Sequence, residues 1–505
     1  MALELSAWLY HLIVFIILVG FVVFFNIVFI IKFQDPEEEG HAYVAKAATL
    51  VGLTFAFASV LMLPFDIALR PANQYFMPLV WEIFLIAAAV LVFAVLPFFT
   101  YFYENEDEGC GKQLCCGFVG SIVTLGVMAV LILILWWFVG YADVPMRQLD
   151  SPILSPNATG CSAYAWQIRN RLATLSPYEY PSPYRAFVHT RMSIPVYAIA
   201  IISTIGWVLL VIFGGVGLFA LPLDMISDFS TRPRKLSAKE FVKVKTELRD
   251  NVRKFEEDLK VFEQLNSGAD KKQKGKMPRM LRELQRRCLE LEKDASLLTL
   301  IDHPKDYNPL VYWLELVGGI FGIIISVIWA AHILIYMAFF KLYPFLNTVF
   351  TVLDGAFPYL GIVFYGIFVF YLLWCVVKGA SKIGLRFLLF SVHPMKLHGT
   401  FMNSFLFNTS LVIITTFALI QFACNCFSVY ATNTSVRTLF GNQIKNMWGL
   451  TYLWDYYPYV LLGVSVISLV WSVTITTCLK KKAREKQEKS MQMRTIKSST
   501  VPSRV

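Results

Sequence analysis

The most regular feature of the chain is a series of long apolar stretches separated by shorter polar segments. Each stretch reaches the roughly 20 apolar residues that a helix needs to cross a hydrocarbon core of about 30 Å. Backbone amides in lipid must be bonded within the protein, and these runs are too continuous for barrel strands, so helices are expected. The candidates lie near residues 8–31, 44–69, 79–103, 114–140, 194–221, 309–340, 352–377, 400–430 and 457–479.

The composition supports an all-α, polytopic integral membrane protein with about nine transmembrane helices. Hydrophobic residues make up 57% of the chain and charged residues only 16%, whereas a soluble globular chain has about 25% charged residues. The first stretch lacks a basic leading region and a small-residue cleavage site, so it is expected to be a retained span rather than a signal peptide. Membrane lipid is therefore an expected partner, and nucleic acid is not.

Basic residues in the polar segments predict the orientation, because short cytoplasmic loops carry an excess of Lys and Arg. The final stretch is followed by three lysines at 480–482, and segments 223–307 and 378–396 are also basic. An odd number of spans then places the N-terminus outside or in a lumen and the C-terminus in the cytosol. Two glycosylation sequons, at Asn157 and Asn433, lie in loops that this topology places outside.

The polar segments divide the chain into four parts. Apolar residues recur at spacings of three and four in 237–265 and 278–300, with Gly, Pro and Lys between them, which predicts a cytosolic antiparallel coiled-coil hairpin. Its seam either closes on itself or receives a partner helix, so 237–300 is the expected surface for cytosolic proteins. The predicted parts are a five-span bundle 1–222 with an external loop 141–193, the hairpin 223–307, a four-span bundle 308–479 and a disordered basic tail 480–505.

The external loop 141–193 interleaves tyrosine and tryptophan with arginine and contains six prolines. This composition fits an interfacial aromatic belt that caps the bundle, and equally a ligand-binding ectodomain, since Tyr, Trp and Arg are frequent binding anchors. Cys161 lies in this loop. A disulfide from Cys161 to Cys424 or to Cys426 is one option, and unpaired thiols are the other.

Few polar groups lie inside the predicted spans, and these are candidates for function because charges in lipid are costly. Asp66 and Arg70 stand one helical turn apart and can pair with each other. His332 and Gln421 lie deeper, where they either bond neighbouring helices or line a cavity. The segment Gly214–Pro222 allows close helix packing, and Pro222 is expected to kink or end its helix. No catalytic constellation, cofactor motif or metal-ligand cluster is present, so no cofactor is expected.

Four sequence blocks follow one another along the chain, namely Leu-Met-Leu-Pro-Phe-Asp at 61–66, Phe-Gly-Gly-Val-Gly at 213–217, His-Pro-Met-Lys at 393–396 and Met-Asn-Ser-Phe-Leu-Phe-Asn at 402–408. Together and in this order they resemble the LIMR family, the lipocalin-interacting and limb-region-like membrane receptors, and most closely its plant and protist branch. The resemblance implies nine spans and an external N-terminus. It also implies links to lipocalin uptake, signalling or receptor trafficking, and in one branch to lysosomal cobalamin export. The family has no established catalytic residues that could be assigned here.

These observations favour a non-enzymatic membrane receptor or a trafficking and signalling adaptor. It would bind a lipocalin-like or small-molecule ligand outside, and cytosolic partners through the hairpin and tail. The alternative is a transporter, a channel or a transporter accessory subunit for a small molecule or lipid, which would need a solvated cavity near the bilayer midplane. The expected site is the plasma membrane or an endomembrane such as the lysosome or vacuole. The sequence does not specify an oligomeric state.

Overall fold

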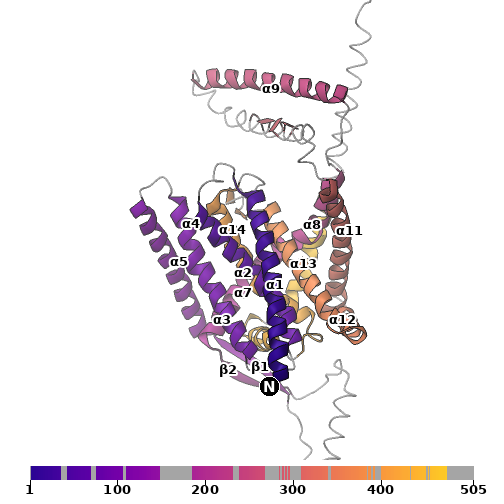
Figure 1. The fold of residues 1–505 in the computed structure, drawn as a ribbon. Helices are drawn as coiled ribbons and strands as arrows, with labels where there is room; N and C mark the ends of the chain where they lie inside the picture. The colour runs from indigo at the N-terminus through magenta and orange to yellow at the C-terminus, as the bar shows by residue number, and fades with distance from the viewer. Residues whose placement is uncertain are drawn as a thin grey trace, which may run out of the picture. The chain divides into compact units, whose positions relative to one another are not determined.

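Long helices dominate the computed structural model of the chain (Figure 1). Single residues and short runs are described at 284–295, 385–392 and 453. The other described residues are 2–35, 42–69, 76–105, 110–147, 185–230, 238–267, 309–338, 343–383, 400–432, 434–450 and 455–474.

Within these residues, nine helices are long and apolar enough to cross a membrane, which confirms the predicted polytopic fold. Several spans are built from consecutive helical elements. The spans are Leu9–Phe33, Tyr43–Ala68, Phe76–Glu104, Gly111–Val139, Ile194–Ser230, Leu310–Ala338, Leu360–Ile383, Met402–Cys426 and Asp455–Thr474.

The elements follow one another with few long connections in the described part of the chain. The first half contains α1 (Ala2–Phe33), α2 (Tyr43–Ala68), α3 (Phe76–Val90), η2 (Leu91–Val95), α4 (Leu96–Glu104), α5 (Cys110–Val139), α7 (Ile194–Leu209), η3 (Leu210–Gly214), α8 (Gly215–Ser230) and α9 (Ala238–Ser267). The second half contains α11 (Pro309–His332), η4 (Ile333–Ala338), α12 (Phe345–Ala356), α13 (Leu360–Ile383), α14 (Met402–Cys426), α15 (Ser435–Arg437), η5 (Thr438–Gln443) and η6 (Ile444–Asn446).

Three of the spans contain a π-helical segment, namely η2, η3 and η4. The seventh span differs from the prediction, because it begins at Leu360 rather than near residue 352. The short helix α12 precedes it, and the chain breaks at Phe357–Tyr359, where Pro358 cannot extend α12 and Tyr359 has a φ of 67°. The fifth span is longer than predicted, since α8 continues through Pro222 to Ser230.

Helix α14 forms the centre of the bundle and packs against α7, α2 and α4. In its most apolar window 78% of the residues are buried, against 6% for the peripheral helix α5. Helix α14 is nevertheless rich in polar residues. Several of their side chains donate hydrogen bonds to backbone carbonyls of the same helix, so these groups are satisfied without water. Thr409 donates to Phe405 O at 2.8 Å and Asn408 donates to Ser404 O at 2.7 Å. The N-x-S/T match at Asn408 is therefore buried inside the protein.

A two-stranded antiparallel sheet of β1 (Tyr141–Arg147) and β2 (Arg185–Arg191) lies at one end of the bundle, which we call the β1–β2 end. Tyr141 stands opposite Arg191 and Arg147 opposite Arg185. Figure 1 shows the start of α1 at this end. The sheet also contacts the segment after α14, because Ala142 bridges to Met447 and Trp448 N donates to Tyr141 O at 3.0 Å. At the opposite end Gln34 forms a bridge with Thr400.

The chain separates into two compact units, residues 1–221 with 322–505 and residues 222–321. The first unit therefore combines spans from both halves of the sequence. In the second unit α9 is helical over Ala238–Ser267, and Arg287 Nη1 lies 2.9 Å from Asp258 Oδ2. Most of the second predicted hairpin helix lies outside the described residues, so the coiled-coil hairpin remains a prediction. The tail 480–505 also lies outside them.

A second small sheet pairs β3 (Leu385–Phe387) with β4 (Phe390–Val392) in antiparallel orientation. These strands follow α13 in the basic segment 378–396. They therefore belong to the loop between α13 and α14.

Candidate functional site

Asp66 is buried at the β1–β2 end of α2, with 2% of its surface exposed. Its carboxylate accepts the indole N–H of Trp81 at 3.0 Å. It also accepts the backbone N–H groups of Ser435 at 3.2 Å and Val436 at 2.9 Å. Asp66 thus fixes the segment after α14 to helices α2 and α3. The predicted partner Arg70 lies outside the described residues.

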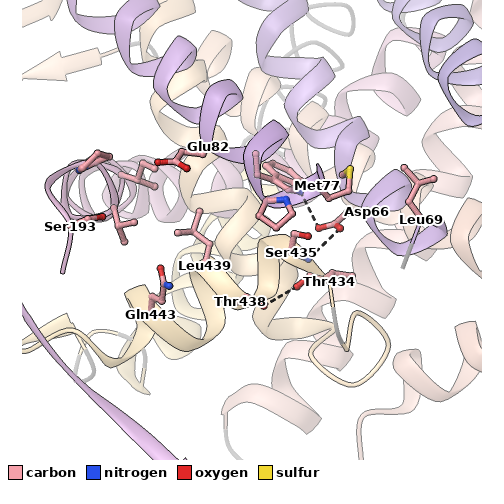
Figure 2. Close-up of a pocket in the computed structure, with 15 residues that line it drawn as sticks. Asp66, Leu69, Met77, Glu82, Ser193, Thr434, Ser435, Thr438, Leu439 and Gln443 are labelled. Carbon is pink, nitrogen blue, oxygen red and sulfur yellow. Dashed lines mark hydrogen bonds between the residues drawn. The ribbon is translucent and has the colours of Figure 1, made fainter. Parts of the chain in front are cut away.

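A cavity of about 580 Å³ opens beside this carboxylate (Figure 2). Its walls come from the end of α2, the start of α3, the start of α7 and the segment formed by α15 and η5. The cavity therefore lies at the β1–β2 end of the bundle. The residues lining it are Asp66, Leu69, Met77, Pro78, Trp81, Glu82, Ser193, Pro195, Val196, Ile199, Thr434, Ser435, Thr438, Leu439 and Gln443.

The described lining combines apolar surface with hydroxyls, one amide and two carboxylates, and contains no Lys, Arg or His. Figure 2 shows Glu82 on α3 and Gln443 on η5 at different walls of the cavity. Glu82 is exposed and Gln443 is half-buried. Within the described part of the chain, no hydrogen bond or ion pair engages the Glu82 carboxylate. Such a lining suits a ligand with an apolar body and a group that donates hydrogen bonds or is positively charged.

Gln421 on α14 lies away from this cavity, where it joins two helices. Its Oε1 accepts hydrogen bonds from the Ser203 hydroxyl and, at 3.0 Å, from Trp207 Nε1, both on α7. Its Nε2 is buried and has no partner among the described residues. Gln421 therefore bonds α14 to α7, which is one of the two alternatives drawn from its position.

His332 at the end of α11 also joins helices. Its Nε2 lies 3.1 Å from Cys426 O, and this carbonyl also accepts a hydrogen bond from Asn347 Nδ2 at 3.0 Å. The imidazole stacks on Phe427, with ring centroids 5.5 Å apart. His332 and Asn347 thus satisfy a carbonyl that the end of α14 leaves without an intrahelical partner. The structure does not bring His332 and Gln421 into the cavity near Asp66.

The segment Gly214–Pro222 packs directly against α13. A Cβ atom on Gly217 would lie 1.7 Å from Cys375 O, and one on Gly379 would lie 2.0 Å from Phe213 O. Only glycine permits two backbones to approach so closely. The expectation of close helix packing at this segment therefore holds at Gly217.

Pro222 leaves a carbonyl without its usual partner, because a proline has no N–H to bond the residue four positions earlier. That residue is Leu218, and its carbonyl accepts the Ser326 hydroxyl. Ser326 is also 2.6 Å from Tyr371 Oη, which donates to Gly322 O at 2.9 Å. This compensation explains why α8 continues past Pro222 instead of ending there.

The sequence predicts that Cys161, Cys424, Cys426 and the sequons at Asn157 and Asn433 lie at the outer end of the bundle. Cys424 and Cys426 are buried free thiols in the structure. Their suggested partner Cys161 lies outside the described residues, as do Asn157 and Asn433. The structure therefore does not test the disulfide, which stays a prediction. Among the described residues, no three His, Cys, Asp or Glu side chains gather into a possible metal site.

The base of the loop 141–193 contains an aromatic and cationic cluster. The Arg191 guanidinium lies 4.0 Å from the ring centroid of Trp136, and Trp136 Nε1 donates to Met192 O at 2.8 Å. His189 Nδ1 lies 2.7 Å from Asp143 Oδ1. This arrangement matches an interfacial aromatic belt. Residues 148–184 lie outside the described part of the chain, so the ligand-binding alternative for the loop stays open.

Comparison with known families decides the relationship. The family model of the LMBR1-like membrane proteins matches residues 11–308 and 285–472. The chain belongs to the LMBR1-like membrane protein family. A LIMR family protein of Dictyostelium discoideum is 31% identical over 493 residues, which cover 92% of this chain and 97% of that protein. A LIMR family protein of Arabidopsis thaliana is 32% identical over 475 residues, covering 88% and 92%.

A rice relative, a LIMR family protein of Oryza sativa subsp. japonica, is 31% identical over 472 residues, covering 88% of this chain and 92% of its own length. These plant and protist relatives confirm the resemblance to LIMR proteins found in the sequence. No solved structure matches the chain.

Sequence reasoning did not identify Trp81, Glu82 or Gln443 as site residues. Both Trp81 and Glu82 lie in an apolar span, where neither residue stands out by its spacing. The presence of a carboxylate inside a span could nevertheless have marked Glu82 as a candidate. Gln443 lies in a loop whose π-helical conformation has no clear sequence signature. The contacts of Asp354 were not predicted from the sequence either. Its carboxylate accepts the backbone N–H of Gly361 at 2.8 Å and the Tyr430 hydroxyl at 2.5 Å.

Proposed function

We propose that this LMBR1-like protein is a non-enzymatic membrane receptor or adaptor whose ligand site is the cavity at the β1–β2 end. The observation behind this proposal is the position of the cavity. It lies at the end of the bundle that the basic-residue pattern places outside or in a lumen. None of the groups expected to line a midplane transport cavity, namely Gly214–Pro222, His332 and Gln421, contributes to it.

The contacts around the cavity support a receptor role. One wall is lined by Thr434, Ser435, Thr438, Leu439 and Gln443. The residues that follow connect to the β1–β2 sheet through the Ala142–Met447 bridge and the bond from Trp448 N to Tyr141 O. A ligand on the external loop or in the cavity would thus contact one continuous hydrogen-bonded segment. A small molecule or a lipocalin-like protein fits this arrangement. Cytosolic partners would bind α9 and the rest of 237–300.

Cysteine accessibility distinguishes a receptor from a transporter even while the ligand is unidentified. We would introduce Thr438→Cys in the cavity, Ser203→Cys beside Gln421 and Lys382→Cys at the opposite end of the bundle. The background would retain only the buried Cys375, Cys424 and Cys426 and have Ser at the other six native cysteines. Cells displaying the protein would be treated with a membrane-impermeant maleimide before or after permeabilisation. Thr438→Cys should react on intact cells, and Lys382→Cys only after permeabilisation.

The buried position Ser203→Cys should react under neither condition, because the α7–α14 contact excludes water in a receptor. Labelling of this cysteine would indicate a solvated path through the bundle and would favour the transporter alternative. Labelling of Thr438→Cys only after permeabilisation would reverse the orientation. The same result would remove the proposed outward-facing site.

A further inference from the structure

The charges that line the cavity at the β1–β2 end indicate which kind of ligand it would bind. Two of its described lining residues, Asp66 and Glu82, are acidic, and none is basic. Asp66 already accepts three N–H groups. Glu82 accepts none in the described part of the chain. Among these lining residues an anionic ligand would meet only like charge, whereas a cation would find the Glu82 carboxylate.

The depth of Glu82 indicates where its partner comes from. The span Phe76–Glu104 has 29 residues, or about 43 Å of helix at about 1.5 Å per residue, which equals the core plus both headgroup layers. Glu82 follows Phe76 by six positions, which corresponds to about 9 Å along the helix. This places the carboxylate near the boundary between headgroups and hydrocarbon.

The surroundings of Glu82 are apolar and open to lipid. On the same helix Leu79, Ile83 and Ile86 are 53%, 60% and 42% exposed, and Ile194 at the start of α7 is 43% exposed. Such side chains face acyl chains in a membrane protein. A carboxylate among them is costly without a partner, and a positively charged headgroup from the bilayer would supply one.

We propose that the cavity binds the ammonium headgroup of a bilayer amphiphile, with Glu82 as the charge partner. The Gln443 amide and the Ser193 hydroxyl, which make no side-chain hydrogen bond within the described part of the chain, supply further polar contacts. The apolar body of the ligand lies against Val196 and Leu439 and continues into the lipid. This inference rests on the proposed function, because it names the ligand class of the same site.

The test uses purified protein in dodecyl maltoside and radiolabelled hexadecylamine as the probe in a scintillation proximity assay. Unlabelled hexadecanol and hexadecanoate, which share the chain length but lack the positive charge, should compete at least about tenfold more weakly than hexadecylamine. Glu82→Gln should weaken hexadecylamine binding about tenfold, equal to about 1.4 kcal/mol. Glu104→Gln, an exposed acid at the other end of the same span, is the matched control and should not change binding.

Equal competition by hexadecanol, or unchanged binding to Glu82→Gln, would overturn recognition of the positive charge. Competition by water-soluble butylamine distinguishes a ligand that comes from the bilayer from one that comes from the aqueous phase. If it competes as strongly as hexadecylamine, the ligand comes from the aqueous side, and the bilayer source is wrong. Failure of amine binding together with outward labelling of Thr438→Cys would reject the ligand class and leave the receptor proposal intact. Labelling of Ser203→Cys would instead reject the receptor proposal.

Discussion

Replacing Asp66 by Asn should destabilise the β1–β2 end of the bundle far more than the near-identical size of the two side chains suggests. The buried carboxylate accepts the N–H groups of Trp81, Ser435 and Val436. One oxygen serves Trp81 and Val436, and the other serves Ser435. Asparagine keeps only one acceptor oxygen, and its amide group would place a donor against the N–H of Ser435.

The magnitude follows from these three contacts. A hydrogen bond to a charged group contributes about 1.5–3 kcal/mol, and a neutral one about 0.5–1.5 kcal/mol. Asp66→Asn loses one charged bond and weakens two others, so we expect a loss of about 3–5 kcal/mol in unfolding free energy. Trp81→Phe removes one donor and leaves the carboxylate with the other two, so its cost should be about 2 kcal/mol.

Denaturant unfolding of the purified protein in mixed micelles would measure both variants and their double mutant. Because the two residues share one bond, the double mutant should cost less than the sum of the single mutants by about 1 kcal/mol. Glu104→Gln, which changes an exposed carboxylate, serves as the control. Unchanged stability of Asp66→Asn, or strict additivity in the double mutant, would refute this account of the carboxylate.

Other predictions concern the bundle and its orientation. Gly217→Ala should destabilise the protein by at least about 3 kcal/mol, because the new methyl group overlaps Cys375 O. Gly463→Ala, where nothing lies within 4 Å of the new atom, should be within about 1 kcal/mol of the parent when both variants are measured by the same denaturant unfolding. Ser326→Ala should cost about 1–3 kcal/mol, since it leaves Leu218 O without its donor, whereas Ser326→Thr should retain most of the stability. An epitope at the C-terminus should be accessible to antibody only after permeabilisation, and staining of intact cells would reject the topology.

The spans could be predicted because lipid imposes a simple rule on composition and length. Each predicted stretch corresponds to a helix that the structure describes as long and apolar enough to cross a membrane. The predicted ends of the spans differ from the structure where a proline and the surrounding apolar residues favour different helix ends. Pro358 marks the break before α13, but it lies within a continuous apolar run that favours a single helix. At Pro222 the opposite occurred, because Ser326, distant in sequence, satisfies the carbonyl that proline leaves open.

The candidate site was much less predictable, because its contacts join residues that are far apart in sequence. Asp66 bonds to Ser435 and Val436, which follow it by 369 and 370 positions. No local pattern indicates that pairing, whereas the spacing of Asp66 and Arg70 suggested a local one. The sheet β1–β2 was missed for a related reason. Its strands flank the loop segment 148–184, and Pro145 within β1 weakens the strand signal.

Two of the acids near the membrane boundary, Asp66 and Asp354, now have a structural explanation, and Glu82 differs from both. Asp66 accepts backbone N–H groups at the start of α15, and Asp354 accepts the N–H groups of Gly361 and Ile362 at the start of α13. Both carboxylates hold a helix start at the β1–β2 end, where helix N-termini favour negative charge. Glu82 makes no comparable contact in the described part of the chain. A charge in a span that no structural bond explains is the better candidate for a ligand contact, so the proposal for binding rests on Glu82 rather than on the more deeply buried Asp66.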